Sequence, residues 1–288
     1  KSGKGIKSVW AQALLIAYLV LMVFITLLPV IITFTLSLKT EQDISTGSLW
    51  SLPTKIQWAN YSSAFTEALS NMGITLFIDL VSVFAMTMIS TFTAYIFVRK
   101  RFPGRNILFY LIILPMLVPG VVSLTPQYLT IVKMGLLGSW WSLILPYVAG
   151  NQIASVFLFR TFMAQQPNDI YEAAEIDGAG DFRMYFSLSL PLTFGIIMVQ
   201  VISIFSAIYN DYLWPLMKFM NIPEHGTLMP ALKELAVRAS ETILPSGLKA
   251  GRGATYALYL VSGIPLIFST VIGLKFFIDG EFASGMKL

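Results

Sequence analysis

The sequence predicts an all-α membrane protein with six transmembrane helices, on the evidence of its composition and of its long apolar runs. Of its 288 residues, 56% are hydrophobic and only 12% are charged, and the mean hydropathy is +0.73. Because an average soluble domain has about a quarter charged residues, the charged side chains here are too few to cover a core of this size. The apolar exterior is therefore expected to face lipid.

Six apolar runs are long enough to cross the bilayer, whose hydrocarbon core of about 30 Å needs roughly 20 helical residues. Three of the runs contain no charged residue, and the other three contain one each: Asp79, Asp211 and Lys275. The predicted spans are residues 11–36, 74–98, 107–132, 140–159, 190–217 and 254–277. Together they predict one transmembrane domain over residues 1–288.

The orientation follows from the short loops, because Lys and Arg beside spans are retained on the cytoplasmic side. The segment "RKRFPGR" from Arg99 to Arg105 follows the second span, whereas the next loop holds only Lys133. Both termini are therefore expected in the cytoplasm, in agreement with Lys1, Lys4 and Lys7 ahead of the first span. That span is expected to be retained rather than cleaved as a signal peptide. Residues 39–73 and 218–253 are then expected to be extracytoplasmic loops.

The sequence lacks the residues that several classes of function require. The chain has no cysteine and one histidine, so thiolate sites and paired-histidine zinc sites are excluded. The only Gly-Lys pair, Gly3-Lys4, lacks the rest of a phosphate-binding loop. The net charge of +4 comes from membrane flanks, which argues against nucleic-acid binding. No catalytic residue, metal or cofactor is therefore assigned to this chain.

The longest cytoplasmic connection, residues 160–189, is typical of a short helix with defined ends. Its signals are a proline suited to a first turn, two acids near the amino end and a glycine stop: Pro167, Asp169, Glu172 and Gly178. They predict a helix from about Asn168 to Asp177. A helix this short is marginal alone in water, so it should dock against a partner surface. The small Ala173 and Ala174 permit such a close approach.

This segment resembles the EAA loop of permease subunits in binding-protein-dependent, ATP-driven (ABC) importers. The residues that carry the resemblance are Glu172-Ala173-Ala174, Gly178, Leu188 and Leu190-Pro191. Asp177-Gly178-Ala179 and the later "YNDYLWPL", Tyr209 to Leu216, are similar to the sugar-importing branch of the maltose-transporter second-permease type. The resemblance covers nearly the whole chain and implies the type I importer permease fold.

In that family the EAA loop forms a coupling helix that fits a cleft in a separate ATPase subunit. The resemblance implies this role for Glu172, Ala173, Ala174, Asp177 and Gly178. It also implies a second permease subunit, two ATPase subunits that bind ATP and Mg²⁺, an extracytoplasmic sugar-binding protein, and a bacterial or archaeal cytoplasmic membrane. The chain itself would be non-catalytic. The alternative interpretation of the segment is an ordinary loop helix.

Polar residues within the spans are candidates for the translocation pathway. Five of them recur at spacings of three and four in the fifth span: Gln200, Ser203, Ser206, Asn210 and Trp214. Buried polar groups in a membrane face a bundle interior or a water-filled cavity, or else they hydrogen-bond neighbouring helices, and both interpretations stay open. Asn151 and Gln152 in the fourth span could present amides to a hydroxylated ligand. Nearby Trp140 and Trp141 suit an interfacial belt better.

Two carboxylates lie within predicted spans. A carboxylate at the centre of a membrane helix costs about 2.5 to 3.5 kcal/mol, so Asp211 should have a partner. Its place near the outer end of the fifth span favours a tie to a neighbouring helix over contact with a sugar. Asp79 lies early in the second span, where solvation at the interface would suffice.

Taken together, the residues and the resemblance predict a permease subunit that imports a carbohydrate, with an oligosaccharide favoured. A permease for another solute, such as a polyamine or phosphate, differs only in specificity. An ion-coupled secondary transporter, in which Asp79 and Asp211 would titrate, has no use for a docking helix. A membrane enzyme is the weakest alternative, because no acid, base or nucleophile constellation lines up at one depth.

Overall fold

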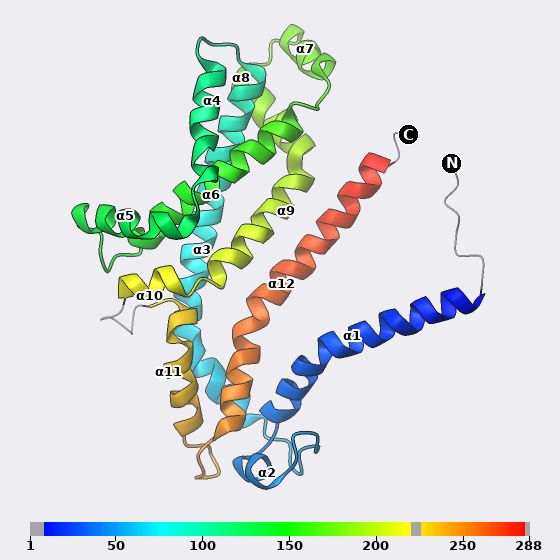
Figure 1. Ribbon diagram of the computed structural model, residues 1–288, viewed down its shortest axis with the longest axis vertical. Coiled ribbons are helices and arrows are strands. Elements are labelled where there is room, and N and C mark those ends of the chain that lie inside the picture. Colours follow the sequence, from blue (N-terminus) through cyan, green and yellow to red (C-terminus); the bar gives the residue numbers. More distant parts are fainter. Residues whose placement is uncertain (1–8, 220–225, 286–288) are drawn as a thin grey trace. The chain divides into compact units, whose positions relative to one another are not determined.

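The computed structural model describes residues 9–219 and 226–285, which form helices joined by short connections (Figure 1). Within these residues the β pairing is an isolated bridge between Ile243 and Lys249. The predictions that used Lys1, Lys4, Lys7 and His225 concern positions outside the described residues.

The helices belong to two compact units. Unit 1 comprises Lys1–Leu69 and Leu232–Gly263, and unit 2 comprises Ser70–Ala231 and Ile264–Leu288. Unit 1 contains α1 (Val9–Ser37), α2 (Glu41–Thr46), the start of α3 (Ala59–Arg99), the end of α11 (Leu228–Glu241) and the start of α12 (Arg252–Gly285). Unit 2 contains the rest of α3, α11 and α12, together with α4 (Arg105–Ile113), η1 (Leu114–Leu117), α5 (Gly120–Lys133), α6 (Trp141–Met163), α7 (Asn168–Ile176), α8 (Asp181–Met184), η2 (Tyr185–Ser189), α9 (Leu190–Tyr209) and α10 (Leu213–Phe219).

Five of the described helices are long and apolar enough to span a membrane, or six if one bent pair forms a single span. The five are Trp10–Ser37, Ala59–Arg99, Trp141–Met163, Asp181–Tyr209 and Arg252–Gly273. The helical membrane fold is therefore confirmed. In a bilayer every backbone N–H and C=O must be satisfied within the protein, which helices achieve locally.

The predicted span over residues 107–132 is not one straight helix in the structure. Arg105–Leu117 and Gly120–Lys133 are separate helical segments bent by 105° from each other. The cause is a pair of prolines, Pro115 and Pro119, which supply no backbone N–H and restrict the residue before them. Val118, just before the second proline, is extended, with φ −93° and ψ 121°.

The two predicted extracytoplasmic loops are also partly helical. Helix α3 begins at Ala59, well before the predicted start of the second span, and its 41 residues cover about 60 Å. No proline interrupts this stretch, so its polar first part continues the helix. Residues 218–253 likewise contain α11. The polarity of these segments predicts that they lie outside hydrocarbon, but a polar segment can still be helical in water.

Unit 1 is organised around buried polar side chains. Lys39 and Asn60 are both fully buried. The Lys39 ammonium donates to the Ser48 carbonyl at 3.1 Å and to the Ser51 hydroxyl at 3.0 Å. The Asn60 amide donates to the carbonyls of Ser37, at 2.8 Å, and Lys39, at 3.0 Å. These bonds offset the cost of removing the two polar groups from water.

The amino end of α12 is capped from a distant part of the chain. The Glu41 carboxylate accepts the backbone N–H of Arg252 at 2.6 Å and its Nε at 2.8 Å. Arg252 also donates to the Ser45 hydroxyl at 2.7 Å. Partial burial alone would raise the pKa of Glu41, but the hydrogen bonds and charge of Arg252 leave that pKa below its usual value. A carboxylate here also suits the positive end of the helix dipole.

Helix α12 approaches this polar region closely at Gly253. A Cβ atom at Gly253 would lie 2.4 Å from the Asn60 amide nitrogen and 2.5 Å from the Lys39 carbonyl oxygen. Since one of these atoms is backbone and the other belongs to a fully bonded amide, neither can give way without breaking hydrogen bonds. Gly253 is therefore required for the packing of unit 1.

We predict that Gly253→Ala destabilises the protein by about 1 to 3 kcal/mol, because overpacking forces the Asn60 hydrogen bonds apart. The measurement is the apparent Tm in detergent, which should fall by several degrees. Gly263→Ala in the same helix is the matched control, since a Cβ there meets nothing within 4 Å. Equal melting temperatures for the two variants would contradict the packing role of Gly253.

Unit 2 has its core in aromatic and aliphatic clusters between helices. One cluster contains Tyr95, Phe159, Tyr171 and Tyr185, from α3, α6, α7 and η2. A second contains Ile78, Ile131, Leu143, Ile144 and Trp214, from α3, α5, α6 and α10. The first cluster holds α7 in place, and the second surrounds the break between α9 and α10. Tyr171 belongs to the predicted cytoplasmic helix, and Trp214 is one of the predicted pathway residues.

Candidate functional site

The predicted cytoplasmic helix is present as α7, with the ends that the sequence indicated. Pro167 precedes its first residue, and Gly178 follows it with φ +74°. The N–H of Gly178 donates to Glu175 at 3.0 Å, and that of Ala179 donates to Ala174 at 2.9 Å. These bonds satisfy carbonyls that the helix end would otherwise leave free, and the left-handed conformation favours glycine.

Helix α7 is anchored to its own chain through Tyr171, whose side chain is only 4% exposed. The guanidinium of Arg99, at the end of α3, lies over the Tyr171 ring at 3.5 Å from its centre. Arg99 also donates to the Asn168 side chain at 2.7 Å. The cation–π contact and the hydrogen bond together fix α7 against α3. Figure 1 shows α7 at the end of unit 2 that also holds the connection between α3 and α4.

A second set of hydrogen bonds joins α7 to the start of α9. The Tyr171 hydroxyl donates to the Gln166 side-chain oxygen. The Gln166 amide then donates to the Thr193 hydroxyl at 2.8 Å and to the Ser189 carbonyl at 3.4 Å. Because Tyr171, Gln166 and Thr193 are all at least half-buried, this chain of bonds is shielded from competing water. A displacement of α7 would therefore act on both α3 and α9.

The opposite face of α7 is exposed. Glu172, Ala173 and Asp177 are accessible, and the apolar Ile176 is 87% exposed. Ala174 instead packs half-buried against the Tyr171 cluster. The two alanines therefore serve different surfaces: Ala174 allows α7 to approach its own chain, and Ala173 lies on the free face. Ile176 and the acidic Glu172 and Asp177 are thus all accessible to a partner on the free face of α7.

Three residues of this region were missed by the sequence analysis: Arg99, Gln166 and Tyr171. Arg99 was used only for orientation, because nothing local shows that it reaches α7. Tyr171 had a usable signal, since it precedes Ala174 by three residues and so shares its helical face. That spacing could have indicated the buried face of α7.

The fifth span begins and ends earlier than predicted: the apolar helix covers Asp181–Tyr209, whereas the predicted span covers 190–217. Helix α9 ends at Tyr209, and α10 begins at Leu213, so the continuous span over 190–217 is wrong. Pro215 has no N–H to continue the helix and its ring opposes a carbonyl four residues earlier, which favours a break there. Trp214 therefore does not extend the polar face of α9; it is 4% exposed and lies in the core of unit 2.

Asp211 stabilises this break. One of its carboxylate oxygens accepts the N–H groups of Leu213, at 3.1 Å, and Trp214, at 3.3 Å, and so caps α10. The other accepts the hydroxyl of Tyr147 in α6 at 2.7 Å. The structure thus shows the tie to a neighbouring helix that the sequence analysis favoured for this carboxylate.

The remaining predicted pathway residues divide by their contacts. Gln200 donates to Ser155 of α6 at 3.0 Å, which is a hydrogen bond between helices. The amides of Asn151 and Asn210 donate to carbonyls of their own helices, those of Tyr147 and Ser206. Three further candidates have polar atoms at partly or fully exposed positions: Gln152, Ser203 and Ser206. Their role in a pathway stays a prediction.

The interpretation of Asp79 as a residue solvated at the membrane interface is wrong. Its side chain is fully buried, and within the described residues neither carboxylate oxygen has a hydrogen-bond partner. The reason lies in α3, which begins 20 residues earlier, so that Asp79 is in mid-helix rather than near a helix end. It interacts electrostatically with Tyr147 and Tyr209.

Comparison with known proteins identifies the family. The model for "binding-protein-dependent transport system inner membrane component" matches residues 86–277, which include α7 and the α9–α10 break. The chain belongs to this family. It is thus a multi-pass inner membrane component of a binding-protein-dependent transport system, and the predicted resemblance to importer permeases is confirmed.

Similar proteins with known names are also permease proteins of transport systems. The sn-glycerol-3-phosphate transport system permease protein UgpE of Yersinia enterocolitica is 27% identical, over 91% of this chain and 92% of its own. The diacetylchitobiose uptake system permease protein NgcG of Streptomyces coelicolor is 32% identical, over 69% and 66% respectively. Among solved structures, a chain of a bacterial ABC transporter for import of the acidic polysaccharide alginate covers 95% of this chain, with 19% identity and a TM-score of 0.77. That likeness supports the permease fold.

We predict that Tyr147 and Asp211 are energetically coupled by about 1.5 to 3 kcal/mol, the net value of a hydrogen bond to a charged acceptor. The measurement is a double-mutant cycle of Tyr147→Phe and Asp211→Asn on the free energy of unfolding in mixed micelles. Tyr110→Phe is the control, because this tyrosine is 65% exposed. A coupling below about 0.3 kcal/mol would show that the bond contributes nothing to the α6–α10 contact.

Proposed function

We propose that this chain is the permease subunit of an ATP-driven importer that translocates a carbohydrate delivered by an extracytoplasmic binding protein. The observation that carries the proposal is the two-sided construction of α7. One side is anchored through Tyr171, and the other presents Glu172, Ala173 and Ile176 to a partner. Family membership supplies the binding-protein dependence.

In the proposed mechanism α7 is the coupling helix and its partner is an ATPase subunit. ATP-driven closure of two such subunits, which hold ATP and Mg²⁺, would displace α7 as a rigid piece. The Arg99 contact would carry that displacement to α3, and the Gln166 bonds would carry it to α9. Two packing arrangements of these helices would then give alternating access to a pathway completed by a second permease subunit.

The proposed orientation places both termini, α7 and the α3–α4 connection in the cytoplasm. The hydrogen bond between Arg99 and Asn168 supports a common side for the basic loop and α7, since it joins their adjoining ends. Basic residues beside spans are retained on the cytoplasmic side. An ATPase subunit on that side would meet the free face of α7.

A carbohydrate is favoured as the substrate, and an oligosaccharide over a monosaccharide. Support comes from a relative whose name specifies diacetylchitobiose, which is an oligosaccharide. Another relative is named for glycerol 3-phosphate, so a small phosphorylated solute is the alternative. In this chain the candidate contacts are amides and hydroxyls on α6 and α9, led by Gln152, Ser203 and Asn210. Such groups form hydrogen bonds with sugar hydroxyls without requiring a charge on the substrate.

We predict that Glu172→Lys and Gly178→Pro each reduce uptake at least tenfold. The first reverses a charge on the free face of α7. The second imposes φ near −65° where the backbone needs +74°, and so deforms the helix end. The measurements are substrate uptake and co-purification of the ATPase subunits. Lys133→Glu, an exposed charge reversal in α5, is the control. Normal uptake in both α7 variants would remove α7 as the coupling element.

The substrate is tested by ATP hydrolysis in liposomes that contain the complete complex. We expect binding protein loaded with one carbohydrate from a panel of mono- and oligosaccharides to raise the hydrolysis rate, because coupling converts its docking into closure of the ATPase subunits. The unloaded binding protein is the control. Stimulation by a polyamine or phosphate alone would change the substrate class. Solute movement driven by an ion gradient, with no ATPase present, would overturn the proposed function.

A further inference from the structure

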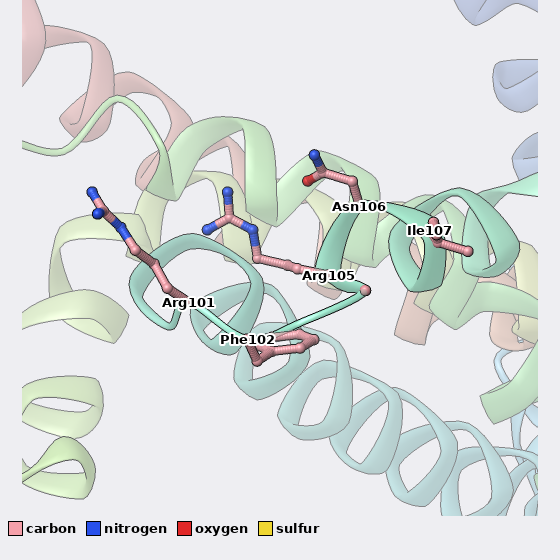
Figure 2. Close-up of a pocket in the computed structure, with 6 residues that line it drawn as sticks. Arg101, Phe102, Arg105, Asn106 and Ile107 are labelled. Atoms are coloured by element: carbon pink, nitrogen blue, oxygen red, sulfur yellow. The ribbon is translucent and has the colours of Figure 1, made fainter.

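The connection between α3 and α4 carries a cavity of about 400 Å³ that the transport function does not use. It is lined by Arg101, Phe102, Gly104, Arg105, Asn106 and Ile107. Figure 2 shows the guanidinium groups of Arg101 and Arg105 extending to the same side of this loop, with the ring of Phe102 on the other side. Two cationic groups therefore converge beside one cavity.

The neighbouring basic side chains are already occupied. Lys100 forms an ion pair with Asp181, Arg99 stacks on Tyr171, and Arg160 lies 3.9 Å from the centre of the Phe109 ring. The Arg101 side chain, by contrast, forms no ion pair or hydrogen bond with any described residue. Among the described residues, the Arg105 side chain donates to the Lys100 carbonyl alone, at 3.2 Å. The two arginines of the cavity are thus available to an external anion.

The loop that presents these arginines is held rigidly. Phe102 packs against Phe97 with ring centres 5.8 Å apart, and Phe97 packs against Phe109 at 5.6 Å. Gly104, with φ +77°, turns the chain so that α4 begins at Arg105. The first turn of α4 has no acidic residue and no side-chain cap, so its positive dipole end adds to the charge of the arginines.

The surface that continues from the cavity along α4 is apolar. Ile107, Tyr110 and Leu111 are 67%, 65% and 58% exposed. A soluble anion would gain nothing from this surface, whereas an amphiphile with an anionic head and hydrocarbon tails would use both parts. Basic pockets beside membrane helices are suited to anionic lipid headgroups.

We propose that this cavity binds the headgroup of an anionic phospholipid, with its phosphate on Arg101 and Arg105 and its acyl chains along α4. The same two arginines also line a neighbouring cavity of about 510 Å³, together with Glu172 and Glu175 of α7. The proposed headgroup site therefore adjoins α7 through a shared cavity wall. A lipid bound to Arg101 and Arg105 would therefore lie beside Glu172, on the free face of α7.

The test is native mass spectrometry of the full chain in detergent, titrated with phosphatidylglycerol and with phosphatidylcholine. We expect phosphatidylglycerol to bind more tightly than phosphatidylcholine. Arg101→Gln and Arg105→Gln should each weaken phosphatidylglycerol binding about fivefold, because each removes one cationic contact, and the double variant should weaken it more than either single variant. Arg183→Gln, an exposed arginine of α8, is the matched control and should bind as the native protein does.

Two further measurements separate the alternatives. Arg105→Lys keeps the charge and should retain most of the binding, so a loss equal to that of Arg105→Gln in a normally folded Arg105→Lys would show that the charge does not hold the headgroup and would overturn the proposal. Soluble glycerol phosphate should not displace the lipid at millimolar concentration; displacement would make the site a free phosphate site instead. Unchanged phosphatidylglycerol binding in a normally folded double variant would overturn the proposal outright. None of these readouts depends on transport.

Discussion

Hydrocarbon offers no hydrogen bonds to a peptide backbone, so every backbone N–H and C=O within the membrane needs a partner in the protein. Helices satisfy this need locally, so the chain is built from them, and each interruption within an apolar run must have a substitute donor or acceptor. At the break between α9 and α10 the substitute is Asp211, which accepts two backbone N–H groups and the Tyr147 hydroxyl. An acid that is costly in a membrane thereby stabilises a turn that a proline requires.

In both units, buried polar side chains are hydrogen-bonded to other groups of the protein. In unit 1 the fully buried Lys39 and Asn60 are bonded to backbone carbonyls and a hydroxyl, and Gly253 leaves room for them. In unit 2 the buried hydrogen bonds from Tyr171 to Gln166 and onward to Thr193 connect a surface helix to a membrane span. Asp79 differs from all of these, because it is buried without such a partner among the described residues.

Helix α7 is a short helix that is stabilised on one face and exposed on the other. Its nine residues are too few for stability in isolation, and its anchor is an aromatic ring held between the core and the Arg99 guanidinium. Anchoring one face leaves the other free for a partner, which a mobile loop could not present in one orientation. The cationic loop between α3 and α4 adjoins this helix. The arginines of the loop and the free face of α7 are therefore neighbours.

The sequence by itself determined the features that depend on local chemistry. Apolar runs showed the spans, and Pro167 with Gly178 bounded α7, because bilayer thickness and backbone conformation act within a few residues. Tertiary structure alone decided which polar residues meet. Asp211 pairs with Tyr147 and Arg99 reaches Tyr171 across long stretches of sequence, and such pairings depend on packing between helices. The bend at Pro119 depends on both sequence and packing. Proline removes a backbone donor locally. Whether the chain then kinks or breaks depends on which neighbouring groups bond the freed backbone carbonyls.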